Sequence, residues 1–480
     1  MEPSGFQRLL SRPEMRVLML VLLLTPPAVG SYHQVQTDDP YITYRYARNL
    51  IEGRGFVYNA GEQVLGTTAP LYALVLALGG GMTNNYPLLS SILSGIGLAA
   101  LSLLIYRILA LLREALAGGI AAVLVVLNPL MGDAFGFELN CFLALIFGAY
   151  LAHLSGRPHL AALLLGLGTL TRGDGLVPAG LIFLSALWTQ RRFPRGPALI
   201  YGALVGSWSA YAIWTFGSPF PNTLAAKQFM GESGLWRPYW YGALRMAYLY
   251  LQQTPLYLFF GVAAVLGCVR LQQVDRRIWL LLGWAGLIFA AYSAMGIPAA
   301  ANYFAALMPF LMIVCGLGVV QLQQALLNRW PARRWKGLLP LFLAAPLLAA
   351  SLTSTAKRLQ THPEPRYWTY RETGEWLAAE TPAGTAVGLA EIGIVGYFSE
   401  RPIVDICGLV SPAVGTHLAA GDPSWPIRTY RPDYVLLHDP VWPALEGPIA
   451  AASWFQQDYA PVRKFAGEEP YRLVLYQKIR

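Results

Sequence analysis

The chain has 480 residues, of which 55% are hydrophobic and only 13% are charged, and its formal net charge is +9. Soluble globular domains carry about 25% charged residues, so this composition excludes that class and indicates a protein embedded in a lipid bilayer. The basic residues lie in short loops between apolar segments and form no stripe with interleaved aromatic residues, so we expect no nucleic-acid partner.

Apolar segments dominate the chain as far as residue 355, and we predict that they form an all-α membrane bundle. A spanning helix needs roughly 20 apolar residues, a length that several of these segments reach. Residues 159–171 are shorter and fit a re-entrant segment as well as a full span. The predicted crossings, about eleven, are residues 16–30, 86–112, 115–131, 138–155, 159–171, 175–189, 197–216, 246–269, 278–295, 303–322 and 336–354.

Two regions of the chain differ from the apolar bundle. Residues 31–85 form a long first loop, in which 42–51 and 70–78 have the pattern of helices lying on the outer leaflet. Residues 356–480 are richer in charge and resemble a small soluble α/β domain. The sequence therefore predicts a transmembrane domain over 1–355 and an extracytoplasmic domain over 356–480, with a helix at 369–380 and strands at 385–390, 402–406, 434–438 and 471–477.

Basic residues predict the orientation of the helices, because cytoplasmic loops are enriched in Lys and Arg. With a cytoplasmic N-terminus, the short outside loops hold Arg45, Arg48, Arg54, Arg172, Lys227, Arg237 and Arg245. The inside segments hold a larger set, namely Arg8, Arg12, Arg16, Arg107, Arg113, Arg157, Arg191, Arg192, Arg195, Arg270, Arg276, Arg277, Arg329, Arg333, Arg334 and Lys336. We therefore expect the N-terminus in the cytoplasm and the C-terminal tail outside.

The acidic pair Asp38-Asp39 is the strongest candidate for chemistry, since it follows the first apolar helix by only a few residues. Mutual repulsion and partial desolvation would raise the pKa of one carboxyl toward the range of a general base, or a divalent cation would hold both ionised. The alternative is structural, because either aspartate would cap a helix that begins at Pro40. The residues alone leave the two readings about equal.

Other polar residues interrupt the apolar segments on the same predicted face. Arg172 and Asp174 lie between two apolar segments, where ionisable groups often mark a substrate path; an internal pair closing a turn is the alternative. Asp133 and Glu138 lie in another outside loop and would converge on the same cavity, or simply end helices. Asn222 and Lys227 follow a proline-rich turn, and Lys227 suits a phosphate unless it is only a solvated lysine.

The run DDPYITYRYARNLIEGRGFVYNAGEQVLGTTAPLYALVLAL at 38–78 closely resembles the first periplasmic loop of GT-C glycosyltransferases. The branch that contains bacterial terminal arabinofuranosyltransferases is the most similar. Similar motifs recur along the chain, at 136–138, 171–175, 218–227, 390–393 and 405–409.

This resemblance implies an inverting transfer of a sugar from a polyprenyl-phosphate donor to a glycan, lipid or protein acceptor, at the outer face of a bacterial cell membrane. It assigns the general base to Asp38, with Asp39 as its partner or as a ligand of a divalent metal ion (Mg²⁺, Mn²⁺ or Ca²⁺). The residues that we expect to bind substrate are Arg45, Glu138, Arg172, Asp174, Asn222, Lys227 and Tyr303.

Two other functions would also place a multi-pass protein in the envelope. A lipid or polysaccharide transporter or flippase is expected to show inverted repeats and polar residues near the middle of the membrane, whereas here the acids gather in outer loops. A non-catalytic envelope assembly protein would tolerate loss of the acidic pair.

Overall fold

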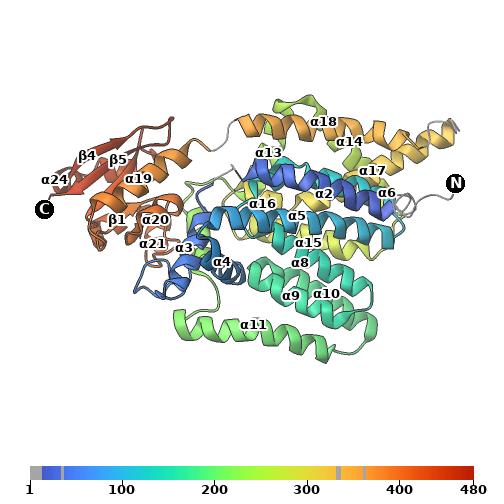
Figure 1. Cartoon of the computed structure of the whole chain (residues 1–480), viewed down its shortest axis with the longest axis horizontal. Coiled ribbons are helices and arrows are strands. Elements are labelled where there is room, and N and C mark those ends of the chain that lie inside the picture. The colour runs from blue at the N-terminus through green and yellow to red at the C-terminus, as the bar shows by residue number, and fades with distance from the viewer. Residues whose placement is uncertain (1–12, 34–36, 331–336, 361–363, 480) are drawn as a thin grey trace.

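A computed structural model describes residues 13–33, 37–330, 337–360 and 364–479 (Figure 1). Five basic residues used to predict the orientation lie outside these ranges, namely Arg8, Arg12, Arg333, Arg334 and Lys336. The helices of the first three quarters of the chain form an elongated bundle, and the C-terminal tail lies at one end of it. The first loop lies at the junction between the two.

The bundle follows the predicted apolar segments closely. Among the described residues, four helices are long and apolar enough to cross a membrane, namely α2 (Pro13–Tyr32), α5 (Tyr86–Leu111), α17 (Met308–Arg329) and α18 (Leu339–Gln360). The number of crossings, about eleven, stays a prediction, because the remaining apolar helices are shorter. They include α6 (Ala115–Val126), α8 (Leu139–Leu154), α9 (Pro158–Thr171), α10 (Leu176–Gln190), α14 (Leu258–Leu271) and α15 (Ile278–Ala294).

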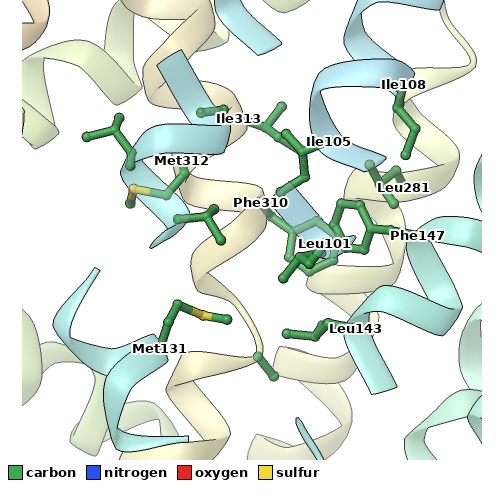
Figure 2. Packing of buried hydrophobic residues seen from close by; sticks show 14 of the residues in the cluster. Leu101, Ile105, Ile108, Met131, Leu143, Phe147, Leu281, Phe310, Met312 and Ile313 are labelled. Carbon is green, nitrogen blue, oxygen red and sulfur yellow. The ribbon is translucent and has the colours of Figure 1, made fainter. Parts of the chain in front are cut away.

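The centre of the bundle is packed with aliphatic and aromatic side chains from α5, α8, α15 and α17 (Figure 2). Ile105, Phe147 and Phe310 are buried there. Small residues let the helices approach closely, as is common between membrane helices. At Gly316 of α17, an added Cβ would lie only 2.5 Å from the carbonyl oxygen of Ala117 in α6.

The predicted helix 246–269 is wrong as a single span, because the structure breaks it in two. Helix α13 (Tyr239–Gln253) ends at Thr254, and α14 begins at Leu258 after a short 3₁₀ turn, Pro255–Tyr257. Pro255 has no amide hydrogen to continue the helix, and the Thr254 side chain accepts a hydrogen bond from the Leu256 amide instead. The sequence marks this break by the polar run Gln252-Gln253-Thr254 before Pro255, which a hydropathy average over a whole span hides.

Shorter elements lie around the ends of these helices. They are α7 (Pro129–Asp133), α12 (Asn222–Glu232) and α16 (Ala301–Ala305), together with α3 (Pro40–Ile51) and α4 (Pro70–Thr83) of the first loop. Helix α11 (Arg195–Phe216) is 22 residues long and packs against α9. Helix α4 keeps an exposed apolar side, with Leu78 and Met82 largely exposed, as an interfacial helix requires. Helix α3 differs from its prediction, because protein encloses most of its residues and it contacts α4 and the tail helix α20 (Gly393–Ser399).

The tail is an α/β unit built on a mixed sheet in the order β2-β1-β3-β5-β4. Strand β1 (Val387–Leu389) pairs in parallel with β2 (Ile403–Asp405) and β3 (Tyr434–Asp439), and β5 (Arg472–Lys478) runs antiparallel to β3 and to β4 (Tyr459–Phe465). The sequence prediction missed β4, whose middle residues are exposed and which is held by its pairing with β5. The tail helices are α19 (Arg366–Glu380), α20, α21 (Val414–Ala419), α22 (Trp425–Tyr430), α23 (Gly447–Ala450) and α24 (Ser453–Asp458).

Side chains of the first loop bind backbone groups of the tail. Arg45, which we expected to bind substrate, is buried and donates hydrogen bonds of 2.8 Å to the carbonyl oxygens of Gly396 and Arg401. Asn59 donates to the carbonyl oxygen of Ile403 and accepts from its amide, at 2.9 and 3.0 Å. The first loop and the tail are therefore held together by buried hydrogen bonds that neither segment satisfies alone.

Replacing Arg45 by methionine tests this junction. The Arg45→Met change removes the Arg45 hydrogen bonds to two buried carbonyl oxygens. Each lost bond costs about 1–3 kcal/mol, so we expect the free energy of unfolding of the tail to fall by about 2–6 kcal/mol. Thermal unfolding of the purified protein in nanodiscs measures the loss. The control is Arg54→Met, because the Arg54 side chain is 39% exposed; equal losses in the two variants would contradict the assignment.

Candidate active site

A cavity of about 590 Å³ opens where the bundle, the first loop and α12 meet. Its polar residues come mostly from loops and helix ends, whereas α10, α11 and α15 contribute mainly apolar side chains. Six of the predicted site residues line it, namely Asp39, Glu138, Arg172, Asp174, Lys227 and Tyr303. All six come from segments predicted to lie on the same side of the membrane, so the fold brings together residues from up to 264 positions apart in the chain (39 to 303).

Asp39 faces this cavity with an exposed side chain. It occupies the N-cap position of α3, directly before Pro40, but its carboxylate makes no capping hydrogen bond. Among the described residues it has no hydrogen-bond or ion-pair partner. The structural alternative, in which Asp39 caps the helix through its side chain, is therefore not what the structure shows.

Asp38 points away from the cavity and is only 4% exposed. Its two carboxylate oxygens accept hydrogen bonds from the backbone amides of Gly393 and Ile394 in the tail, at 2.8 and 2.7 Å. Burial raises the pKa of Asp38 and the Glu391 charge raises it further, while the Ile394 amide opposes the shift. Asp38 does cap a helix, but that helix is α20 of the tail, far along the chain.

Arg172 lies at the centre of a buried ionic group. Its guanidinium donates to the carboxylates of Glu138 at 2.8 Å and Asp174 at 2.7 Å. Tyr292 donates to the second oxygen of Asp174 at 2.7 Å. Because two carboxylates surround one guanidinium, this group has a net negative charge, and Arg172 has little capacity left for a further anion.

The local sequence sets the position of this ionic group. Helix α9 ends at Thr171, Arg172 is extended, and residues Gly173–Gly175 form a single 3₁₀ turn that leads into α10. Gly175 is required there, because an added Cβ would lie 2.7 Å from the backbone of Thr169. Nearby, the carbonyl oxygen of Gly136 accepts hydrogen bonds from Tyr44 and from α5, which fixes the segment that carries Glu138.

Lys227 is the second basic residue of the cavity lining. It is half-buried on α12 and, among the described residues, no hydrogen-bond or salt-bridge partner is seen for its ammonium group. Burial lowers the pKa of Lys227, but Tyr303 and Asp39 beside it raise the pKa by more, so the net shift is upward. Lys227 is therefore a cation at neutral pH with its hydrogen bonds free for a ligand.

Asn222 does not line the cavity. Its side-chain amide donates to the carbonyl oxygens of Gly408 and Leu409 in the tail, at 2.8 and 2.9 Å. Asp133 also differs from expectation, because it forms an ion pair with Arg358 of α18 and does not line the cavity. With Arg45 and Asp38, Asn222 belongs to the contacts that hold the tail in position.

Sequence reasoning missed two residues of the lining. Tyr292 lies near the end of a predicted span, and aromatic residues are common at membrane interfaces. The sequence therefore does not mark Tyr292 as a site residue, although it donates a hydrogen bond to Asp174. Leu409 comes from the tail, where only the family resemblance of the run 405–409 marks it in the sequence.

The lining residues do not fit a metal centre well. Among the described residues no group of three or more His, Cys, Asp and Glu side chains is arranged so that it could hold a metal ion. Glu138 and Asp174 already bind Arg172, which leaves Asp39 as the available carboxylate of the cavity lining. Mg²⁺ and Ca²⁺ need at least about six oxygen ligands, so Asp39 alone would hold them only with water and substrate.

Comparison with known sequences covers only the tail. A family model described as a domain of unknown function, DUF8728, matches residues 358–476. No curated protein sequence matches the chain.

Comparison with solved structures covers nearly the whole chain. ArnT from Cupriavidus metallidurans, bound to undecaprenyl phosphate, matches with a TM-score of 0.59 and 13% identity over 96% of this chain and 97% of its own. An oligosaccharyltransferase of Archaeoglobus fulgidus in complex with Zn and sulfate gives 0.58 and 12%, over 94% and 72% of the two chains. The same enzyme tethered to an acceptor peptide gives 0.56 and 13%, over 96% and 74%.

The chain has the GT-C fold. The predicted fold resemblance is thus confirmed across the bundle and the tail. At 12–13% identity the similarity shows the fold alone and does not show which reaction the chain catalyses. The arabinofuranosyltransferase branch is not distinguished by these neighbours and stays a prediction, as do the roles of the site residues.

Removing the central guanidinium tests the ionic group. Arg172→Met leaves two buried carboxylates uncompensated, and we expect the free energy of unfolding to fall by about 3–5 kcal/mol. Adding Glu138→Gln to this variant should recover part of the loss, measured by a double-mutant cycle in nanodiscs. Arg277→Met serves as the control, because the Arg277–Asp275 pair is exposed and such pairs contribute about 0–1 kcal/mol. No recovery in the double variant would contradict the ionic arrangement.

Proposed function

We propose that this protein is an integral membrane glycosyltransferase that moves a sugar from a polyprenyl-phosphate donor to a hydroxyl group of a glycan, lipid or protein acceptor. One observation carries the proposal. The cavity is lined by the carboxylate of Asp39 and the ammonium of Lys227, beside apolar walls. Neither group has an ion-pair partner among the described residues. A base and a cation are the two groups that this reaction requires.

The chemistry follows from these two groups. The acceptor hydroxyl attacks the anomeric carbon on the face opposite the phosphate, Asp39 takes the hydroxyl proton, and the bond between carbon and phosphate oxygen breaks. Attack from the opposite face inverts the anomeric centre. Because phosphate is a good leaving group, it needs positive charge from Lys227 and no strong general acid.

Asp39 is a better candidate for the base than Asp38, to which the resemblance gave this role. Both oxygens of Asp38 accept amide hydrogens in a buried position, whereas the carboxylate of Asp39 lies in the cavity. The oxygen of a base has to come within about 3 Å of the hydroxyl oxygen whose proton it removes. Of the two aspartates, only Asp39 lines a cavity large enough for a substrate. Lys227 is preferred to Arg172 as the phosphate-binding cation, because the Arg172 guanidinium is already paired with Glu138 and Asp174.

The apolar lining supports a lipid-linked donor. Val205, Trp208 and Ile213 of α11 face the same cavity as Lys227, so a phosphate bound there would have its polyprenyl chain beside hydrocarbon. The solved structure of ArnT, which has the same fold, contains undecaprenyl phosphate. We further propose an outward-facing site in a bacterial cell membrane and either a pentose or a hexose as the transferred sugar.

A panel of polyprenyl-phosphate sugars tests the activity. Purified protein in nanodiscs should transfer the sugar of at least one pentose or hexose donor to an acceptor, detected as product mass. Asp39→Asn should lower kcat by about 10²–10⁴-fold, the usual contribution of a general base. Absence of transfer with every donor would contradict the function, and full activity of Asp39→Asn would contradict the role of Asp39.

Lys227 is tested by its effect on the donor. Lys227→Met removes a charge-assisted hydrogen bond worth about 1.5–3 kcal/mol, so we expect the donor KM to rise by roughly 10–100-fold. Lys464→Met is the matched control, because the Lys464 side chain is 74% exposed on the surface of the tail. An unchanged donor affinity, measured also by binding of the unglycosylated polyprenyl phosphate, would exclude Lys227 from phosphate binding.

A further inference from the structure

The junction between the acidic pair and the tail brings together the base proposed above and a segment more than 350 residues away in the chain. Asp38 accepts the amide hydrogens of Gly393 and Ile394, which are 355 and 356 positions further along. Asp39 follows Asp38 directly, and its carboxylate faces the cavity. The backbone that carries Asp39 is thus attached to α20 through the preceding side chain.

Close packing at α20 leaves little freedom at this attachment. An added Cβ at Gly393 would overlap the carbonyl oxygen of Asp38, so the two backbones are in direct contact. Tyr58 of the first loop donates a 2.6 Å hydrogen bond to the carbonyl oxygen of Ile392, one residue before the amides that bind Asp38. Arg45 binds the carbonyl oxygen of Gly396 at 2.8 Å. The first turn of α20 is therefore held from several sides by the loop that carries the acidic pair.

The tail also contacts the opposite side of the cavity. Asn222 of α12 binds the carbonyl oxygens of Gly408 and Leu409, and Leu409 itself lines the cavity. Phe229 of α12 packs against Gly415 in α21, where an added Cβ would meet its ring. Because α12 carries Lys227, the tail touches both segments that supply the proposed base and the proposed phosphate ligand.

We propose that the C-terminal tail is a working part of the active site and that Asp38 is the positioning residue through which α20 fixes the orientation of Asp39. This inference rests on the proposed glycosyl transfer for its catalytic consequence, but the physical coupling of α20 to the acidic pair does not depend on the reaction. A displacement of about 1 Å at a catalytic group can cost roughly 10²-fold in rate, so rigid attachment of Asp39 matters directly.

Asp38→Asn is the first test, made on the full-length protein in nanodiscs. The asparagine amide offers one acceptor oxygen where the carboxylate offers two, so one tail amide loses its partner. We expect kcat to fall by roughly 10–100-fold, while the donor KM changes by less than about twofold because Lys227 is untouched. The fall in kcat at low pH should persist as in the wild type, since the proposed base, Asp39, is unchanged.

Two results would overturn this role of Asp38. Loss of this fall in kcat at low pH in Asp38→Asn would make Asp38 itself the base. A rise in donor KM without a fall in kcat would mean that Asp38 acts only on binding. Tyr58→Phe is a milder variant in case Asp38→Asn does not fold, and it should lower kcat in the same selective way.

Hydrogen–deuterium exchange provides a readout that does not require activity. Asp38→Asn should speed exchange by at least about tenfold in peptides covering 37–44 and 391–396, because the local opening free energy falls in both segments together. Glu446→Gln is the matched control. Glu446 is also a fully buried carboxylate that accepts backbone amides, those of His438 and Trp442, but its partners lie within the tail.

The two experiments separate failure of the inference from failure of the proposed function. If wild-type protein transfers no sugar from any donor, the proposed function fails, and exchange alone still decides whether α20 and the acidic pair are coupled. Exchange at 37–44 that is unchanged in Asp38→Asn, or equally accelerated in Glu446→Gln, would overturn the inference even in an active enzyme.

Discussion

Side chains of the first loop form hydrogen bonds with backbone groups of the tail, and the shape of the cavity depends on these hydrogen bonds. The amides at the start of α20 have no partners within their own helix, and the carbonyl oxygens of Gly396 and Arg401 accept hydrogen bonds from Arg45. Without Asp38, Arg45 and Asn59, these polar groups would be buried and unpaired. The loop in turn is held in the conformation that directs Asp39 toward the bundle.

Buried ions need an opposite charge or hydrogen bonds, and this requirement explains how charge is distributed inside the cavity. Arg172 is surrounded by Glu138 and Asp174, so the group is internally paired and is suited to hold a structure or to accept hydrogen bonds from hydroxyl groups. Lys227 and the Asp39 carboxylate influence each other through their opposite charges, but neither makes an ion pair or a side-chain hydrogen bond with the residues that the structure describes. A ligand that supplies an anion and a hydroxyl group would give each of them a direct partner.

Much of the fold could be predicted because its signals are local. Apolar segments gave the helices, and the side of the membrane predicted for each loop correctly grouped Asp39, Glu138, Asp174 and Lys227. The break at Thr254 is hidden by a hydropathy average over the whole span, although Gln252, Gln253 and Pro255 mark it locally.

The division of roles within the acidic pair could not be predicted. Asp38 and Asp39 are adjacent and chemically identical, and only a partner from residues 393–394 distinguishes them. Arg45 and Asn222, which were also predicted to bind substrate, likewise bind backbone carbonyl oxygens of the tail. A family motif marks residues as constrained, but it does not say whether a substrate or the protein's own backbone imposes the constraint.

The short helices beside the cavity have a consequence for the surrounding lipid. Helix α9 has 14 residues and α10 has 15, which at 1.5 Å per residue gives about 21–23 Å, against a hydrocarbon thickness of about 30 Å. If both helices cross the membrane as predicted, local thinning of the bilayer is one way to relieve such hydrophobic mismatch. The head groups of neighbouring lipids would then sink toward the level of Arg172 and Asp39. A lipid-borne phosphate would reach these residues by lateral diffusion within the leaflet, with little need to be extracted from it.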